Sequence, residues 1–383
     1  MNKLITPLAL AFSCFCALAA TKETNAARPA SPATSGSKPR MEVCFVLDTT
    51  GSMGGLIEGA KQKIWSIANE MVSAKPTPEL RLGLVAYRDR GDEYVTKTFD
   101  LTNDIDAVYA QLQSFRAAGG GDEPESVNEA LDAAVHKMSW SGDKHVLKII
   151  FLVGDAPPHM DYADGPKYPD VCQQGMKLDL IINTVQCGAI ASTTRFWKEI
   201  ASLSEGAYAA IPQAGNMTAI STPMDAELAE LNRKLGTTLV AYGGERARTM
   251  VASKQLAAEA APASVAADRL AFNSHAGVAV QGEGELLDGL NSGKLKLDSL
   301  DRNDLPTDLK KLSNEELKAE IEKKQKDRSE VQARIQTLSQ EREQFIAAER
   351  KRLAAQGKTD SFDEKVAEAI RAEAARKGIE YGK

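Results

Sequence analysis

Three oxygen-bearing side chains stand at alternate positions directly after an apolar run near the start of the chain. They are Asp48, Thr50 and Ser52, and the run before them extends from Met41 to Leu47. Alternate positions of an extended segment face the same side, so one carboxylate and two hydroxyl groups would converge. Oxygen ligands of this kind suit a hard divalent cation. The segment therefore predicts a cation site where a buried strand ends.

Two later loops could supply further ligands. Asp122 follows three glycines in the stretch GGGDEPE, and Asp155 follows the apolar run 146–153 in the stretch GDAPPH. A carboxylate placed directly after a buried strand is costly without a partner, and a cation would provide one. The carboxyl ends of parallel strands meet at one edge of a sheet, where ligands bind in open α/β folds. We expect Asp122 and Asp155 to complete the cation site, while His159 is interpreted as a packing residue. The alternative for Asp48, Thr50, Ser52 and Asp122 is a helix cap, and the alternative for Asp155 is a turn residue.

The segments that would position these residues alternate between strands and helices. Apolar and alternating stretches predict strands, and apolar residues at spacings of three and four predict helices. The expected strands are 41–47, 82–87, 94–101 at an edge, 146–153, 178–186 and 207–211. The expected helices are 55–73, 105–112, 125–135 and 196–203. This order predicts an α/β fold, a doubly wound, mostly parallel sheet flanked by helices in the Rossmann-like manner, with a C-terminal α-helical extension.

The loops and their order resemble the von Willebrand factor type A (vWA) domain with its metal-ion-dependent adhesion site (MIDAS). That family carries the pattern D-x-S-x-S, then a distant Thr and a distant Asp. The first element reads Asp48-Thr49-Thr50-Gly51-Ser52 in this chain, and the last reads Gly154-Asp155. The resemblance implies Mg²⁺, Mn²⁺ or Ca²⁺ at the top of the sheet. It also implies a protein partner that coordinates the metal through an acidic residue.

The sequence departs from the family at the position of the distant Thr, where the nearest equivalent is Asp122. A third carboxylate would make the ligand set net negative. Such a set should bind the cation more tightly and weaken its attraction for an acidic partner. These oxygen-bearing residues come without a nucleophile or a base, so the leading hypothesis is a non-enzymatic, metal-dependent binding or adhesion module.

Two other functions remain open at this stage. A Mg²⁺-dependent phosphatase resembling the haloacid dehalogenase superfamily would use Asp48 as nucleophile and Asp155 with Asp161 in an acidic loop. Thr50 stands where that family has its general acid, and this disfavours the enzyme. The third hypothesis is a scaffold with a vestigial metal site, in which the C-terminal helices carry the function.

Composition and the first residues bear on location and partners. A formal charge of -6 gives no support for a nucleic-acid-binding face. Residues 1–20 combine Lys3, an apolar run and small residues, so we expect a signal peptide that is cleaved near Ala19 or Ala20. No other segment reaches the roughly 20 apolar residues that a membrane span needs. We therefore expect an exported protein, in the periplasm or outside the cell.

The rest of the chain divides by composition. We interpret 21–39 as a flexible linker, 40–222 as the α/β domain and 223–300 as a linker with short helical pieces. Residues 301–356 predict a long helix or coiled coil, with a further helix in 357–383. Apolar and charged residues share the seam of the long helix, so self-association through 305–353 and a helix folded back on its own chain both remain open.

Three cysteines remain after the expected cleavage. Cys44 lies in a predicted buried strand and is interpreted as a small hydrophobic residue. Cys172 and Cys187 are candidates for a disulfide in an oxidising compartment. Their spacing alone leaves the pairing open. The absence of C-x-x-C and H-E-x-x-H motifs argues against a zinc site built from them.

Overall fold

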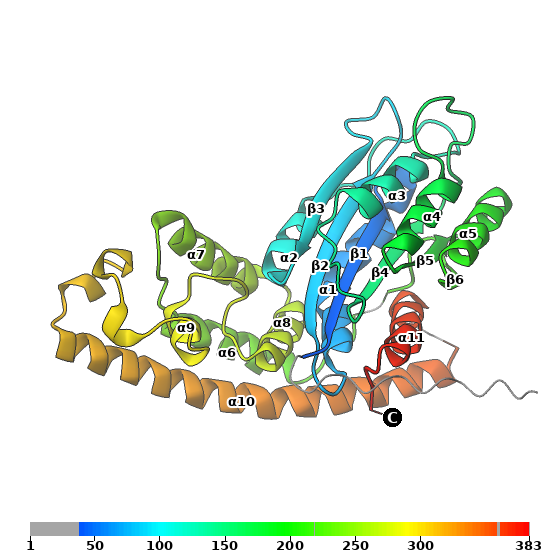
Figure 1. The fold of residues 1–383 in the computed structure, drawn as a ribbon. Coiled ribbons are helices and arrows are strands. Elements are labelled where there is room, and N and C mark those ends of the chain that lie inside the picture. Colours follow the sequence, from blue (N-terminus) through cyan, green and yellow to red (C-terminus); the bar gives the residue numbers. More distant parts are fainter. Residues whose placement is uncertain (1–37, 218, 358–360, 383) are drawn as a thin grey trace, which may run out of the picture. The chain divides into compact units, whose positions relative to one another are not determined.

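A six-stranded sheet forms the centre of the α/β part of the chain (Figure 1). The computed structural model describes residues 38–217, 219–357 and 361–382, so the expected signal peptide and most of the expected linker 21–39 lie outside it. The strand order is β3-β2-β1-β4-β5-β6. The strands are β1 (Arg40–Asp48), β2 (Glu79–Tyr87), β3 (Thr96–Thr102), β4 (Leu147–Gly154), β5 (Leu180–Cys187) and β6 (Tyr208–Ile211).

All neighbouring strands are parallel except the edge pair β2–β3, which is antiparallel. The predicted doubly wound, mostly parallel sheet is confirmed. Strands β1 and β4 lie at its centre and are buried almost throughout, which explains their nearly continuous apolar sequences.

Helices cover both faces of the sheet. Alternate residues of β1 point to opposite faces, so Phe45 joins one core cluster and Val46 joins the other. The first face carries α1 (Gly54–Val72), entered through the short 3₁₀ turn Gly51–Met53, together with α2 (Ile105–Ser114) and α11 (Ser361–Arg376). The second carries α3 (Val127–His136), α4 (Tyr168–Lys177) and α5 (Ala191–Leu203). Helix α4 was not predicted, because its sequence is mostly polar and only a narrow stripe is buried.

Residues 223–300, interpreted from the sequence as a linker with short helical pieces, form four packed α-helices. They are α6 (Asp225–Thr238), α7 (Glu245–Ala260), α8 (Ala263–Ala276) and α9 (Leu286–Asn291). Helix α8 packs against both α1 and α6. Its alanines look like low-complexity sequence, but small side chains let helices approach closely, and Ala266 and Ala267 are buried. The alanine-rich composition did not predict this helical layer, which packs against α1 of the α/β part.

The long helix is α10 (Asn314–Ala355), and it begins at the predicted capping box of Ser313 and Glu316. Three 3₁₀ turns precede it, at Leu297–Ser299, Arg302–Asp304 and Leu309–Lys311. Its seam residues Ile335 and Leu338 are buried in a cluster with α6 and α8. Of the two alternatives, the structure has the helix folded back on its own chain. Most of the seam considered for self-association is covered within the chain, and Phe345 at its end is exposed.

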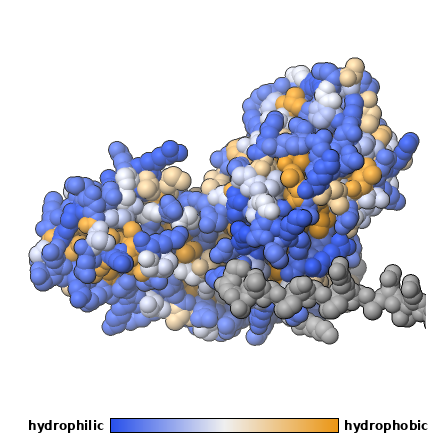
Figure 2. All heavy atoms as spheres, viewed as in Figure 1, coloured by the Kyte–Doolittle hydropathy of each residue, from blue (hydrophilic) through white to orange (hydrophobic). Residues whose placement is uncertain are grey.

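The part of α10 that is visible in the space-filling view is mostly hydrophilic (Figure 2). Phe345 is the one large hydrophobic side chain of α10 that is exposed among the residues that the structure describes. Over the same residues, no helix combines the length and apolar character needed to cross a membrane.

Two arginines interrupt the apolar seam of α10 for a structural reason. Arg342 lies 2.7 Å from Asp225 of α6 and 2.5 Å from Asp268 of α8. Arg328 makes a comparable buried set of contacts with Glu285, at the start of α9. Charged residues at these seam positions would weaken a coiled coil. Here both arginines form buried ion pairs with residues in or at the start of other helices.

The three described cysteines are all free, and the candidate disulfide between Cys172 and Cys187 is not formed. Cys187 points from β5 into the core cluster that includes α1 and α11. Cys172 lies on α4 in the cluster of the opposite face. The sheet separates the two thiol groups, so this pairing is incompatible with the fold. Cys44 is fully buried, as expected.

Candidate metal centre

The segment after β1 folds so that its oxygen atoms gather. The backbone N–H of Thr50 donates to Asp48 Oδ1 at 2.8 Å, and the Thr50 hydroxyl donates to the same oxygen at 2.7 Å. The hydroxyl oxygens of Thr50 and Ser52 lie 3.4 Å apart. Asp48 and Thr50 are buried, while Ser52 is exposed. The structure thus brings together the three residues whose alternate spacing suggested convergence.

The other oxygen of Asp48 is unusual. Asp48 is 0% exposed, and its Oδ2 atom has no hydrogen-bond partner. Burial raises the pKa of Asp48 to about 7, and the nearby charge of Asp155 adds to this rise, while hydrogen bonds from Thr50 and from the backbone of Asp155 oppose it. A buried carboxylate oxygen without a partner is unfavourable, and a cation would satisfy it.

Asp155 lies beside this segment because β1 and β4 are adjacent parallel strands, with Leu47 paired to Val153. Gln213 donates from Nε2 to Asp155 Oδ2 at 2.6 Å. The hydroxyl of Thr193 donates to the backbone oxygen of Asp155 at 2.8 Å. Asp155 therefore emerges at the same edge as Asp48 and is held there by polar contacts from the second face of the sheet and from the loop after β6.

Glu125 is the residue that sequence reasoning missed. It is 4% exposed, and its Oε2 atom has no hydrogen-bond partner. Burial raises the pKa of Glu125 to about 9, and repulsion from Asp48, Asp89, Asp92 and Asp155 adds to the rise. Its backbone N–H donates to Pro157 O at 2.9 Å, which holds the residue against the loop of Asp155. The available signal was the last acid of GGGDEPE, directly before the helix at Ser126.

Asp122 is exposed, unlike Asp48 and Glu125. Gly119 and Gly120 both have positive φ, at 78° and 77°, a conformation that favours glycine. They turn the loop outward, and the Asp122 side chain is 64% exposed. One Asp122 oxygen comes within 4.8 Å of ligand atoms of Asp89 and His159, so the structure groups it with these residues. The carboxylates of Asp48, Glu125 and Asp155 are not gathered that closely among the described residues.

Gly154 is required by close approach at this edge. A Cβ atom added there would lie 2.4 Å from the Tyr87 hydroxyl and 2.9 Å from Asp48 Cβ. We expect Gly154→Ala to lower the free energy of unfolding by about 1–3 kcal/mol through overpacking. Urea denaturation measures this. Gly142→Ala is the control, because a Cβ atom there meets nothing within 4 Å. Equal stability of the two variants would contradict the prediction.

The buried carboxyl groups predict a pH dependence of the metal-free protein. In the unfolded chain Asp48 and Glu125 release their protons near pH 4, but in the folded chain their pKa values are about 7 and about 9. The folded state therefore binds more protons between these values, so the contribution of these two groups to stability is fully present below about pH 4 and is lost as pH rises to about 9.

We expect the metal-free chain to lose more stability between pH 5 and pH 9 than Glu125→Gln does. Other buried acids with raised pKa values, such as Asp288 and Glu373, contribute equally to both proteins. Urea unfolding in EDTA at several pH values measures the difference, and parallel curves for the two proteins would contradict it.

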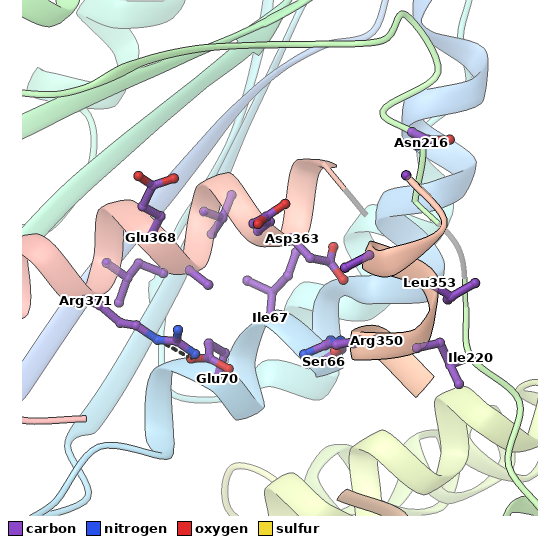
Figure 3. Close-up of a pocket in the computed structure, with 16 residues that line it drawn as sticks. Ser66, Ile67, Glu70, Asn216, Ile220, Arg350, Leu353, Asp363, Glu368 and Arg371 are labelled. Atoms are coloured by element: carbon purple, nitrogen blue, oxygen red, sulfur yellow. Dashed lines mark hydrogen bonds and ion pairs between the residues drawn. The ribbon is translucent and has the colours of Figure 1, made fainter. Parts of the chain in front are cut away.

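A cavity lies elsewhere on the first face of the sheet (Figure 3). It has a volume of about 990 Å³ and lies among the second half of α1, the end of α10 and α11. An ion pair between Glu70 and Arg371 crosses one side. Glu70 is 16 residues along α1 from Gly54, or about 24 Å at 1.5 Å per residue, so this side of the cavity is remote from the oxygen cluster.

Comparisons with known proteins now bear on identity. Residues 42–222 match a family model described as the von Willebrand factor A domain. Human von Willebrand factor A domain-containing protein 7 is 36% identical over 120 residues, which cover 31% of this chain and 12% of that protein. An alpha-protein kinase of Dictyostelium discoideum, vwkA, is 24% identical over 148 residues, 38% of this chain and 23% of that protein. The chain thus spans a small part of the length of these relatives.

Among solved structures, proximal thread matrix protein 1 from the mussel byssus, with a zinc-occupied MIDAS motif, is 14% identical. The likeness covers 46% of this chain and 42% of that one, with a TM-score of 0.36. The family match and the sheet described above support a von Willebrand factor A domain over residues 42–222 of this chain, a kind of domain that typically mediates protein–protein interaction.

Proposed function

We propose that this chain is an exported, non-enzymatic binding module that holds a divalent cation at its vWA domain and uses it to bind a protein partner. The cation is Mg²⁺, Mn²⁺ or Ca²⁺, and its ligands come from Asp48, Thr50, Ser52 and Asp155. Glu125 replaces Asp122 in this set. The observation that carries the proposal is the buried Asp48 Oδ2 atom, which has no hydrogen-bond partner.

The charges around this atom support a cation. The charge of Asp155 raises the pKa of Asp48, and the charges of Asp48 and Asp155 raise the pKa of Glu125, in each case after the larger effect of burial. Burying like charges together is costly without a compensating charge. A divalent ion would supply that charge and a partner for the unsatisfied oxygens. The donor atoms are all oxygen, which favours hard ions over zinc or copper.

The site is accessible to solvent at Ser52. Ser52 is exposed, whereas Asp48 and Thr50 are buried, so a partner would reach the ion from the side of Ser52. Three carboxylates around a divalent ion leave a net negative charge. We therefore infer tight cation binding with a weaker attraction for an acidic group of the partner than a two-carboxylate site would have.

The phosphatase alternative gains no support from the geometry. It needs an acidic residue two positions after Asp48 to protonate the leaving group. Thr50 occupies that position, and its hydroxyl donates to Asp48 itself.

Cation binding is tested by calorimetry on the full chain with Mg²⁺, Mn²⁺ and Ca²⁺. We expect one hard-ion site that Asp48→Asn and Asp155→Asn each remove. Asp170→Asn is the control, because Asp170 is exposed on α4. At a hundredfold excess over Kd, the ion should stabilise the native chain by about 2.7 kcal/mol. Binding that survives in Asp48→Asn would refute the proposed site.

The partner and the location need separate experiments. Immobilised chain should retain a specific partner in Mg²⁺ and release it in EDTA, and Asp48→Asn should fail to retain it. Retention that is indifferent to EDTA would contradict a metal-dependent interaction. For export, the chain with residues 1–20 is produced in a bacterial host with an outer membrane. Mass spectrometry should find a periplasmic product that begins near residue 20, and an uncleaved cytoplasmic product would contradict export.

A further inference from the structure

A second group of ligand atoms lies beside the proposed cation site and is not part of it. It consists of Asp89, which follows β2, Asp122 of the glycine loop and His159 of the loop after β4. His159 Nε2 is 3.4 Å from Asp89 Oδ2 and 3.9 Å from Asp122 Oδ2. Three segments that are distant in sequence thus present one nitrogen and two carboxylate oxygens to a common point.

The state of the His159 ring follows from its other nitrogen. Nδ1 lies 2.8 Å from Asp161 Oδ1, and a carboxylate can only accept there, so Nδ1 carries the proton. In the neutral ring, Nε2 then presents a lone pair toward Asp89 and Asp122. His159 is 3% exposed, and its Nε2 atom has no hydrogen-bond partner. A buried ring nitrogen that faces two carboxylates is stabilised by a positive charge at this point, and either a proton on Nε2 or a bound metal ion supplies it.

The ring is held in this orientation by its surroundings. It stacks on Tyr162 with centroids 4.0 Å apart and an interplanar angle of 10°. Its backbone N–H donates to Glu125 O at 3.1 Å. A carboxylate on one nitrogen and a free lone pair on the other is the arrangement that orients histidine ligands in metal sites.

Hydrogen bonds also hold the Asp89 carboxylate in a fixed orientation. It is buried, and its Oδ1 atom accepts from the Ser126 hydroxyl at 2.9 Å. The Tyr162 hydroxyl contacts both Asp89 oxygens, at 2.9 and 3.1 Å. These contacts fix the carboxylate while its Oδ2 atom faces His159. The exposed Asp122 then leaves the point between the three residues open to solvent on one side.

We propose that Asp89, Asp122 and His159 bind a divalent transition-metal ion of borderline character, with Zn²⁺ as the representative. Two atoms bound at about 2.0–2.1 Å to a tetrahedral zinc ion lie about 3.3 Å apart. The 3.4 Å contact already matches this spacing, and a small inward movement of the exposed Asp122 loop would bring the 3.9 Å contact to it. A nitrogen with two carboxylates and an open fourth position suits Zn²⁺ better than Ca²⁺ or Mg²⁺.

The second site would stiffen the first. The backbone pairing of Glu125 with Pro157 and His159 already joins the glycine loop to the loop of Asp155. An ion that binds Asp122 and His159 would cross-link the same two loops through their side chains. The inference stands on its own residues and does not depend on a cation at Asp48.

The test is calorimetric titration of the full chain with Zn²⁺ alone. His159→Asn removes Nε2 but keeps a donor near the position of Nδ1, so the contact with Asp161 is retained. Asp122→Asn alters an exposed loop side chain and should leave folding intact. The matched control is His145→Asn, because His145 is exposed and its Nδ1 also contacts an aspartate, Asp143, at 3.0 Å.

We expect one Zn²⁺ per chain, bound at least about tenfold more weakly by His159→Asn and by Asp122→Asn. His145→Asn and Asp48→Asn should bind Zn²⁺ as the wild type does. The proposal is overturned if the wild type binds no Zn²⁺, if both site variants bind it unchanged, or if Asp48→Asn alone removes it. Should His159→Asn fail to fold, Asp122→Asn decides the question. Loss of Mg²⁺ binding in Asp48→Asn tests the first site independently.

Discussion

Removal of residues 358–383 should abolish cooperative folding of the vWA domain. The reason is that α11 belongs to the core on the first face of the sheet, although it lies far outside residues 42–222 in sequence. Its fully or nearly fully buried side chains include Phe362, Val366 and Ile370. Burying each such side chain contributes about 1.5–3 kcal/mol. The sum is comparable with the about 5–15 kcal/mol by which domains are stable.

The residues after α11 add polar contacts. The N–H of Lys75 donates to Glu380 O at 2.8 Å, and the Tyr381 hydroxyl donates to Met71 O at 3.1 Å. Circular dichroism and urea denaturation of the truncated chain should show a lost or broadened transition. A fragment that ends at residue 222 should fail in the same way, because it lacks α11.

A graded version of this experiment uses single substitutions in α11. Ile370→Ala should lower the free energy of unfolding by about 2–5 kcal/mol. Glu368→Ala, on the exposed side of the same helix, should change it by no more than about 0.5 kcal/mol. A truncated chain that unfolds with the midpoint and slope of the full chain would show that α11 is dispensable.

Arg328→Met should be the most damaging single substitution in α10. The Arg328 guanidinium is buried and is 2.8 Å from each oxygen of Glu285 and 3.0 Å from Asp288 Oδ1. It also donates to the backbone oxygen and the hydroxyl of Thr238, each at 3.1 Å. Its removal leaves two buried carboxylates without their cation, which should cost about 3–5 kcal/mol. Urea denaturation measures the loss.

The chain offers a matched control for this charge. Arg334 lies less than two turns further along α10 and pairs with Glu227 at 2.7 Å, but both side chains are about half exposed. Arg334→Met should therefore cost at most about 1 kcal/mol. Combining Arg328→Met with Glu285→Gln should cost less than the sum of the single changes, because the pair is lost only once. Equal effects of Arg328→Met and Arg334→Met would contradict the role assigned to burial.

The sequence could not predict whether the seam of α10 packs against its own chain or forms a coiled coil. Periodicity identified the helix and its capping box, and both are present. The same periodicity placed Arg328 and Arg342 on an apolar seam, where they disfavour a coiled coil. Their partners, Glu285, Asp225 and Asp268, are between 43 and 117 residues away. Local sequence carries no information on such pairs.

In the proposed metal site, some ligands were predictable from local sequence and one was not. Asp48, Thr50 and Ser52 were predictable because they follow a strand in one short segment, and Asp155 because its strand is the most apolar of the chain. The choice between Asp122 and Glu125 was not predictable. It depends on how two glycines with positive φ turn the loop outward and on where the backbone returns to pair with Pro157.

The sequence by itself determined the alternation of strands and helices, the strand end that carries Asp48 and the start of the long helix, because periodicity, buried strands and caps are local properties. Tertiary contacts decide which acids are buried together, that Cys172 and Cys187 lie on opposite faces of the sheet, where the helices of residues 223–300 pack and that α11 completes the core. Each of these depends on contacts between segments distant in sequence, where burial and charge pairing outweigh local preference.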